Sequence, residues 1–375
     1  MNKPAPESAY ASDHAAAHLT VRLGAIAANY REVLRRAASA AAAPVVKANA
    51  YGMGIGPVAH TLLNAGADTF FVARLEEGIE ARTLIPSARI FVLDGVAPGA
   101  APALVTNRLT PVLNSLDEIA EWSARAKSER RELDAALHID TGMNRSGLSH
   151  GELSQLAARI REALVGINLV LVMSHLARAD EPDAEMNWTQ LARFRAGLAA
   201  LPPAPASLAA SAGIELGRDF HFDLVRPGLA IYGGNPMPSR PNPFRTVASL
   251  TGQVLQIRHI DAGETVGYAA TFTAMRPSAL ATVASGYADG LIRARSLKGH
   301  AAIDGIRVPF AGRMSMDLLA LDVTDVPEAA RARGAVVEFM GDVVTLEEVA
   351  EAAGTITHEV LTAISPRARR IYVDE

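Results

Sequence analysis

Short apolar segments alternate with longer stretches of helical periodicity between about residues 43 and 230. The eight apolar segments cover residues 44–47, 69–72, 90–93, 109–113, 136–140, 169–173, 206–209 and 222–225. Nearly continuous apolar strands between amphipathic helices are typical of a parallel sheet that is covered on its faces. Eight strand–helix units in fewer than 200 residues favour a closed (β/α)8 barrel of the TIM type.

An open doubly wound sheet is the alternative architecture. It typically carries the pattern G-x-G-x-x-G after its first strand, followed by an acidic residue. Gly52, Gly54 and Gly56 follow the first apolar segment, but their spacing differs from that pattern. The barrel is therefore the favoured prediction.

The pattern changes after about residue 235, where four prolines at positions 236, 238, 241 and 243 indicate a linker. Strand-like segments with glycine-containing turns follow at residues 249–257, 265–273, 279–285, 301–310, 318–323 and 336–340. One helix is expected near residues 346–353. We therefore predict an N-terminal α/β barrel over residues 18–238 and a mainly antiparallel β-strand C-terminal domain over residues 239–375.

The composition is that of a globular protein, with 49% apolar and 20% charged residues in a chain of 375. The 36 basic and 40 acidic side chains give a net charge of −4, which offers no reason to expect a nucleic-acid or anionic-membrane partner. The absence of cysteine excludes disulfides, thiolate nucleophiles, iron–sulfur clusters and cysteine-based zinc sites. No apolar run approaches the roughly 18–20 residues of a membrane span.

The first 17 residues combine two prolines with acidic residues and many alanines. They lack the apolar stretch of a secretory signal. We expect a flexible N-terminal tail over residues 1–17 and a cytoplasmic protein.

Lys47 ends the first apolar segment, at the position where barrel enzymes place reactive groups. Two interpretations are open from its position alone. The lysine extends its charged end to solvent at the rim of the barrel, or it is a desolvated amine that can form a Schiff base.

The segment Val45-Val46-Lys47-Ala48-Asn49-Ala50-Tyr51-Gly52-Met53-Gly54 resembles the pyridoxal-phosphate attachment motif of the alanine racemase family. Four further segments resemble that family in the same order. They are residues 140–147 (DTGMNRSG), 225–228 (VRPG), 285–290 (SGYADG) and 311–317 (AGRMSMD). The resemblance extends from about residue 18 to residue 373 and favours the catalytic interpretation of Lys47.

This resemblance implies pyridoxal phosphate bound at Lys47 and the interconversion of L- and D-alanine, which would provide D-alanine for cell-wall peptidoglycan. Racemisation removes the Cα proton from one face and returns a proton to the other, so the protein must supply two acid–base groups while the cofactor serves as electron sink. The resemblance assigns Lys47 to the D-face and Tyr287 to the L-face. It further implies that Tyr287 comes from the partner subunit of a homodimer with shared active sites.

A phenol has an ordinary pKa of about 10 and requires support to act as a base at neutral pH. The resemblance implies that His175 and Arg226 give this support and that Arg226 meets the ring nitrogen of the cofactor. Arginine does not donate a proton in practice, so the ring would be a weaker sink and side reactions would be limited. The alternatives are a rim histidine bonded to backbone, a half-buried tyrosine in a turn, and a surface arginine in an ion pair.

Phosphate binding is expected at the ends of the last two barrel strands, where loops and helix starts offer backbone N–H groups. Ser211, Gly228 and Leu229 lie there, and the resemblance adds the hydroxyl of Tyr51. It also implies that Arg145 bonds the 3′-oxygen of the cofactor and approaches the substrate carboxylate, which the backbone N–H of Met316 meets as well. Alone, each of these residues is more typical of a turn or a solvated loop.

Two positions depart from the family pattern. His138 stands where several members carry a lysine, often carbamylated, that bonds the arginine matching Arg145. We expect another group, such as chloride or a different anion, to orient Arg145. Pro366 stands where members commonly carry a tyrosine that reaches the phosphate and narrows the entrance. We therefore expect looser phosphate binding or a wider entrance, and tolerance of serine.

Four other functions are alternatives to this one. A broader alanine/serine racemase differs only in specificity. A barrel-type pyridoxal-phosphate decarboxylase would carry a run of glycines and a catalytic cysteine, and both are missing. A cofactor-carrying protein without turnover would lack the second domain. A metal hydrolase is disfavoured because no two histidines have ligand spacing near a strand end, and no metal is expected.

Overall fold

The computed structural model describes residues 15–375, except for the side chain of Leu297. The expected N-terminal tail lies almost entirely outside the described residues, because only residues 15–17 of it are included. The chain divides into two compact units. The barrel unit comprises residues 26–50 and 54–245, and the sheet unit comprises residues 15–25, 51–53 and 246–375.

Eight short parallel strands form the core of the barrel unit. They are β2 (Ala41–Ala42), β3 (Thr69–Val72), β4 (Arg89–Val92), β5 (Thr110–Leu113), β6 (Leu133–His138), β7 (Ile167–Met173), β8 (Ala206–Ser207) and β9 (Leu224–Val225). Strands β3 to β8 pair in sequence order, and β2 pairs with β9. Seven of the strands overlap the predicted apolar segments, whereas the first, β2, lies at residues 41–42, just before the predicted segment 44–47.

Hydrogen bonds outside the named strands close the ring. A parallel bridge joins Ala210 to Arg226, which connects the end of β8 to the end of β9. Another joins Val45 to Phe71 of β3, and the amide of Val46 donates to the carbonyl of Phe71 at 2.8 Å. The eight strands therefore form a closed barrel, and the predicted (β/α)8 architecture is confirmed.

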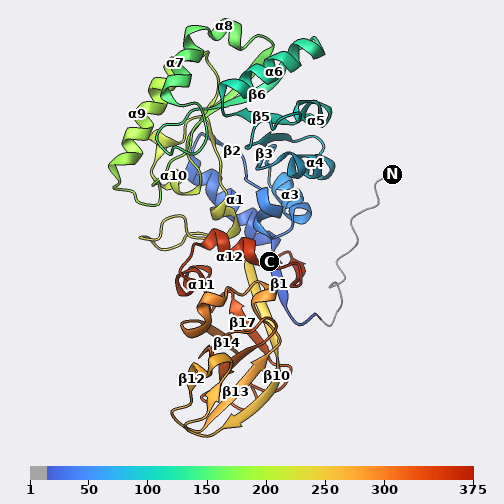
Figure 1. The fold of residues 1–375 in the computed structure, drawn as a ribbon, viewed down its shortest axis with the longest axis vertical. Coiled ribbons are helices and arrows are strands. Elements are labelled where there is room, and N and C mark those ends of the chain that lie inside the picture. The colour runs from blue at the N-terminus through green and yellow to red at the C-terminus, as the bar shows by residue number, and fades with distance from the viewer. Residues whose placement is uncertain (1–14) are drawn as a thin grey trace. The chain divides into compact units, whose positions relative to one another are not determined.

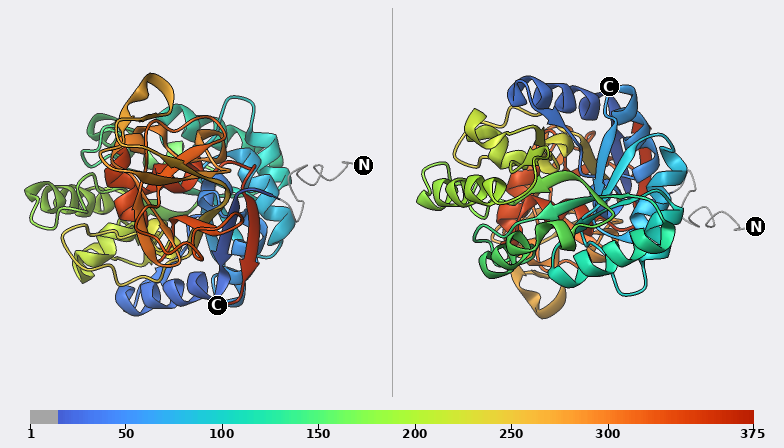
Figure 2. Two further views of the ribbon diagram at one scale, coloured as in Figure 1. Left: turned by 90° about the horizontal axis from the view of Figure 1, so that it is seen from below. Right: turned by 90° about the horizontal axis from the view of Figure 1, so that it is seen from above.

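Helices surround these strands, as the right-hand view of Figure 2 shows. They are α1 (Leu23–Ala37), α3 (Ile55–Asn64), α4 (Leu75–Leu84), α5 (Ala101–Thr106), α6 (Leu116–Glu129), α7 (His150–Ala158), α8 (Ile160–Ala163), α9 (Glu185–Ala199) and α10 (Ser211–Glu215), with single turns η1 (Arg218–Phe220) and η2 (Leu229–Tyr232). Because helices cover their outer face, the strands bury most of their side chains. Within the core, the rings of Phe71 and Phe91 stack at 4.8 Å.

The sheet unit contains a mainly antiparallel sheet, drawn in the lower half of Figure 1. Its strands are β1 (His18–Arg22), β10 (Ala248–Ile260), β13 (Ser278–Val283), β14 (His300–Ile303), β15 (Ile306–Pro309), β16 (Leu319–Asp322), β17 (Val336–Met340) and β18 (Arg369–Val373). Their order is β15-β14-β17-β10-β1-β18, and β13 pairs with both β10 and β16. The predicted antiparallel C-terminal domain is therefore confirmed.

Two details of this unit differ from the sequence pattern. The segment 265–273 is a hairpin of β11 (Thr265–Val266) and β12 (Phe272–Thr273) around a turn, η3 (Tyr268–Ala270), instead of one strand. Strand β1 lies where the sequence suggested the start of the barrel. It pairs with β10 and with β18 in the sheet unit, and its side chains alternate between buried and partly buried positions, as expected for a strand with one covered face.

The remaining elements of the sheet unit are two helices and two single turns. They are α11 (Leu346–Ala353), α12 (Thr357–Ala363), η4 (Tyr287–Asp289) and η5 (Arg293–Leu297). The hydroxyl of Thr345 accepts a hydrogen bond from the amide of Glu348, which starts α11 at the predicted residue. Among residues 15–375, no helix has the length and apolar character that a membrane crossing requires.

Candidate functional site

Lys47 lies at the start of a left-handed turn that follows the first barrel strand. Ala48, Asn49, Ala50 and Tyr51 all have φ between 52° and 54°. Such a conformation costs roughly 1–2 kcal/mol for each residue with a side chain. The amide of Ala50 donates to the carbonyl of Val46 at 3.0 Å, and the Oδ1 of Asn49 accepts from the amide of Ile55 at 2.7 Å. Strain of this kind is typical of functional positions.

The surroundings of Lys47 favour its neutral amine. Burial lowers the pKa of Lys47, and the nearby positive charge of Arg145 lowers it further, while the carboxylates of Glu77 and Asp94 act in the opposite direction. A lysine whose pKa is lowered is a better nucleophile and base near neutral pH. Lys47 is therefore a partly desolvated amine of the kind that carries covalent chemistry.

Glu77 connects the turn after Lys47 to the start of α4, a role that no sequence pattern indicates. Its Oε1 accepts a hydrogen bond of 2.7 Å from the amide of Ala48. Its Oε2 accepts from the amides of Ala73 at 2.8 Å and Arg74 at 3.2 Å, at the start of α4. No serine or threonine precedes Glu77 at capping spacing, so the sequence gives no local signal for this contact.

Arg226, at the end of β9, is only 3% exposed. Its Nη1 donates to the Oγ of Ser207 at 2.5 Å, and its Nη2 donates to the carbonyl of Ser174 at 2.6 Å. Its Nε has no hydrogen-bond partner among the described residues. Burial lowers the pKa of Arg226 to about 10, so the group remains a cation at neutral pH. The alternative of a surface arginine in an ion pair is therefore wrong.

His175 follows β7 and contacts this guanidinium. Its Nδ1 lies 3.3 Å from the Nη2 of Arg226. A guanidinium only donates, so Nδ1 is the acceptor and the proton of the neutral ring is on Nε2. Burial lowers the pKa of His175 to about 3, and the charge of Arg226 is the next cause. At neutral pH His175 is therefore a neutral ring with an Nε2–H donor.

His138, at the end of β6, has the opposite tautomer. Its Nδ1 lies 2.9 Å from the Oδ1 of Asn114, and the amide nitrogen of Asn114 donates to the carbonyls of Leu93 and Val112. The oxygen of Asn114 therefore faces the ring, and His138 donates from Nδ1 and presents Nε2 as an acceptor. Burial lowers the pKa of His138 to about 4, followed by the charges of Arg226 and Arg145.

Arg145 lies on the loop after β6, which Asp140 organises. The Oδ1 of Asp140 accepts hydrogen bonds from the amides of Gly142, Met143 and Asn144 at 2.9, 3.0 and 3.1 Å. The Arg145 side chain is exposed. Its positive charge contributes to the lowered pKa of Lys47, His138 and His175, so Arg145 acts electrostatically on all three side chains.

The ends of β8 and β9 form a cradle of backbone N–H groups. The Oγ of Ser211 accepts from the amides of Gly228 at 3.0 Å and Ala230 at 3.2 Å, which ties the two strand ends together. The first intrahelical bond of α10 runs from Ile214 to Ala210, so the N–H groups of residues 211–213 precede it. Leu229 starts η2 beside them. Such paired helix starts bind anions.

In the sheet unit, Tyr287 and Met316 lie on two loops that touch through their backbones. The amide of Tyr287 donates to the carbonyl of Ser315 at 3.2 Å, and the amide of Ala288 donates to the carbonyl of Met316 at 3.0 Å. A side chain at Gly286 would place Cβ 2.2 Å from the Met316 oxygen, which explains the glycine. The side chains of Tyr287 and Met316 are 40% and 53% exposed.

The segment around Tyr51 packs within the sheet unit. Tyr51 is buried, its ring lies 5.8 Å from that of His358, and burial raises the pKa of its hydroxyl. The carbonyl of the next residue, Gly52, accepts from Nη2 of Arg370 at 3.0 Å. The hydroxyl of Tyr372 donates to the carbonyl of Met53 at 3.0 Å, so Tyr372 has a structural partner. Pro366 is exposed.

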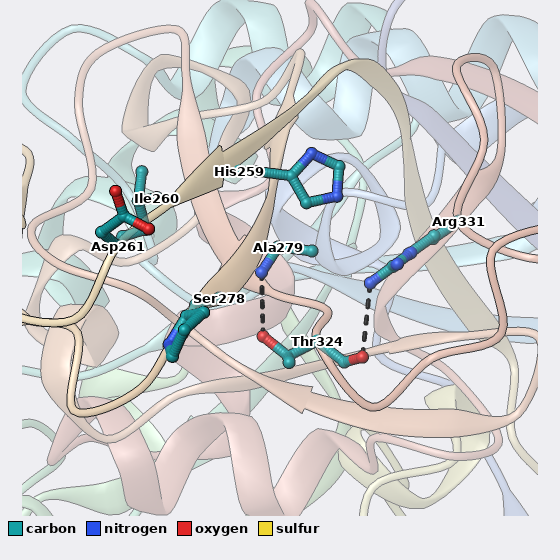
Figure 3. A pocket seen from close by; sticks show the side chains of 8 residues that line it. His259, Ile260, Asp261, Ser278, Ala279, Thr324 and Arg331 are labelled. Carbon is teal, nitrogen blue, oxygen red and sulfur yellow. Dashed lines mark hydrogen bonds between the residues drawn. The ribbon is translucent and has the colours of Figure 1, made fainter.

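A cavity of about 390 Å³ in the sheet unit is separate from these residues. Its lining includes His259, Asp261 and Arg331, and Arg331 donates to the backbone carbonyl of Thr324, as Figure 3 shows. None of the expected site residues lines it. Within residues 15–375, no three histidine, aspartate or glutamate side chains are grouped as metal ligands.

Two family models match the chain. The N-terminal domain of alanine racemase matches residues 21–236, and the C-terminal domain of alanine racemase matches residues 247–372. The chain is 47% identical to the catabolic alanine racemase of Agrobacterium fabrum over 97% of this chain and 94% of the relative. It is 48% identical to an alanine racemase of Methylobacterium nodulans over 96% of both chains.

Solved structures of the same family are also similar to this structure. The crystal structure of alanine racemase from Bartonella henselae with covalently bound pyridoxal phosphate superposes with a TM-score of 0.92 at 39% identity. The match covers 96% of this chain and 100% of that one.

Proposed function

The chain belongs to the alanine racemase family, and we propose that it interconverts L- and D-alanine with bound pyridoxal phosphate. The observation that carries this proposal is the group at the barrel strand ends. A desolvated lysine, a buried arginine and a cradle of N–H groups lie at the ends of the first, eighth and seventh strands.

The residues of the barrel unit fit this cofactor. Lys47 offers a partly buried amine for covalent attachment. The N–H groups of residues 211–213 and of Leu229 suit a phosphate, beside Gly228, whose own amide is bonded to the Oγ of Ser211. We propose that the hydroxyl of Tyr51 joins them. The Nε of Arg226 has no partner among the described residues, so it can donate to the ring nitrogen. Arg145 would bond the 3′-oxygen of the cofactor and, with the backbone N–H of Met316, the substrate carboxylate.

Two groups would move the proton. When bound, pyridoxal phosphate supplies an electron sink for the negative charge that forms at Cα. Lys47 would take or return the proton on the D-face, and its lowered pKa supports this role. Tyr287 of the partner subunit would serve the L-face. The Nε2–H of His175 is an oriented donor that suits a phenolate oxygen, because Arg226 occupies Nδ1.

Arg226 would also limit side reactions. Its positive charge persists at neutral pH, and a guanidinium hydrogen bond does not protonate the ring nitrogen. With Arg226 at the ring nitrogen, the bound cofactor would be a weaker electron sink than a protonated ring, and negative charge at Cα would be short-lived. Arg226 would thereby favour racemisation over transamination and decarboxylation.

His138 is a candidate for the group that orients Arg145 in this chain. His138 has an unprotonated Nε2, and the charge of Arg145 contributes to the lowered pKa of its ring. We propose that this nitrogen accepts a hydrogen bond from Arg145 and so orients it where other members use a lysine; a bound anion such as chloride is the alternative, and it would act on Arg145 without this nitrogen.

We further propose that the protein is a cytoplasmic homodimer with shared sites and that it provides D-alanine for peptidoglycan. A broader alanine/serine racemase is the second candidate, because Pro366 supplies neither a hydroxyl nor a backbone donor at the expected entrance. A decarboxylase is disfavoured by the lack of any cysteine.

One experiment tests these alternatives together. The purified protein is incubated with pyridoxal phosphate, and the optical rotation of L-alanine, L-serine and a bulkier amino acid is followed. Loss of rotation with alanine is expected. Comparable kcat/KM values for alanine and serine would favour the broader racemase, and unchanged rotation with all three would contradict the proposed function.

A further inference from the structure

We propose that Arg367 is a positioning residue that holds the loop of Tyr287 and the loop of Met316 in one fixed arrangement. The inference rests on the proposed function, because it assumes that these two loops complete the racemase site.

The guanidinium of Arg367 bridges two carboxylates of the sheet unit. Its Nε lies 3.3 Å from Oδ1 of Asp289, and its Nη1 donates to Oδ1 of Asp317 at 2.8 Å. Asp289 ends the single turn that Tyr287 begins, and Asp317 directly follows Met316. One side chain therefore links both loops.

Asp289 makes this link stiff. It is 6% exposed, and its Oδ2 accepts a hydrogen bond of 2.9 Å from the amide of Gly286. Both oxygens of this carboxylate are thus engaged, one by the backbone before Tyr287 and one by Arg367. A buried carboxylate that loses its cation is destabilised, so the turn would adjust if Arg367 were removed.

The segment that carries Arg367 is itself anchored against the same turn. The amide of Ser365 donates to the carbonyl of Asp289 at 3.3 Å. A Cβ at Gly290, where φ is +103°, would lie 2.6 Å from the Cα of Ile364. Pro366, with its restricted φ, directly precedes Arg367. The guanidinium therefore extends from a backbone that already touches the turn.

The functional consequence follows from exposure. The side chains of Tyr287 and Met316 are 40% and 53% exposed, so packing within this unit does not determine where they lie. Their positions depend on the two backbones that Arg367 connects. A displacement of about 1 Å in a catalytic group can cost on the order of 100-fold in rate.

The test compares the holoenzymes of Arg367→Gln and Arg367→Lys with the wild type. Loss of the α-hydrogen from L- and from D-alanine is followed in deuterated water, with racemisation followed by polarimetry. We expect Arg367→Gln to slow racemisation and exchange from L-alanine by about tenfold or more. At saturating substrate, exchange from D-alanine with retention of configuration should fall much less, because Lys47 lies in the other unit, while a displaced amide of Met316 should raise KM for both enantiomers. Arg367→Lys should fall between.

Two further variants separate positioning from stability. Arg307→Gln breaks the exposed Arg307–Glu348 pair of 2.9 Å in the same unit and should leave both exchange rates unchanged. Asp317→Asn weakens one arm of the bridge alone and remains informative if Arg367→Gln does not fold. It should reproduce the L-side loss in smaller measure.

Each remaining outcome counts against the inference. Equal loss of exchange from both enantiomers, or no loss in Arg367→Gln, would overturn it, as would an unchanged L-side rate in Asp317→Asn. A wild-type holoenzyme that does not racemise alanine would instead overturn the proposed function, so the two failures are distinguishable.

Discussion

In the barrel unit, Arg226 and Ser211 at the strand ends are buried, and each forms at least two hydrogen bonds. In the sheet unit, by contrast, Tyr287 and Met316 are exposed to solvent. Arg226 has one partner on β8 and one directly after β7, and Ser211 ties two strand ends together. Among the described residues, Tyr287 forms hydrogen bonds through its backbone alone. The first arrangement suits holding a cofactor in one orientation. The second suits a group that completes a site on another surface, in keeping with the proposed homodimer.

The largest effect is expected at Lys47, the residue on which the site of the barrel unit depends. Lys47→Ala should lower racemisation by about 10⁴-fold, because it removes both the attachment point and one acid–base group. The visible absorption of the covalently bound cofactor should disappear with it. Lys127→Ala, on the exposed face of α6 in the same unit, is the matched control and should keep both signals.

Tyr287 tests whether the exposed side chain is chemical or merely a surface group. Tyr287→Phe should lower racemisation by about 100-fold or more, mainly by suppressing proton loss from L-alanine. The unfolding temperature should hardly change, because the hydroxyl lies on an exposed side chain. Tyr268→Phe, at an even more exposed tyrosine of this unit, should be silent. Equal loss of α-hydrogen exchange from both enantiomers would contradict the L-face assignment.

Arg226 and Arg145 test whether the buried residues of the barrel unit contribute more to stability than the exposed ones. Arg226→Gln leaves the buried Oγ of Ser207 and carbonyl of Ser174 without their donor, so the free energy of unfolding should fall by about 2 kcal/mol. Arg145→Gln, at an exposed side chain, should stay within about 0.5 kcal/mol of wild type. Urea denaturation followed by tryptophan fluorescence measures both. Equal values would show that burial of Arg226 does not distinguish the two arginines.

The same contrast explains what the sequence could predict. The barrel strands are largely buried on both faces, so they appear as continuous apolar segments, and the pattern predicts seven of the eight; β2 lies just before its predicted segment. Strand β1 alternates between buried and partly buried side chains, and its two neighbouring strands lie more than 200 residues away in the sequence. Its pattern predicts a strand, but not the sheet to which the strand belongs.

The site shows a similar limit. Lys47, Arg226 and Ser211 follow strand ends, so position and motif both mark them. Glu77 accepts a hydrogen bond from the amide of Ala48, and Asn114 accepts one from the ring of His138. These partners are distant in the sequence and meet only in the folded chain. The tautomers of His138 and His175 likewise depend on one neighbour each, and no local pattern encodes them. Arg367 directly follows Pro366, which departs from the family pattern, but the carboxylates that it binds, Asp317 and Asp289, are 50 and 78 positions away in the sequence.

Glu77 provides the smallest expected effect and tests the electrostatics around Lys47. Glu77→Gln keeps an oxygen for the amide of Ala48 and removes a negative charge that favours the lysine ammonium. The pKa of Lys47, already lowered by burial, should fall further. More of the amine is then neutral at any pH below that pKa, so acylation of Lys47 in the cofactor-free protein should be faster there. Glu76→Gln, at the exposed neighbouring position, should leave the pH profile in place. A profile that moves to higher pH in Glu77→Gln would mean that the hydrogen bond to Ala48, and not the charge, dominates.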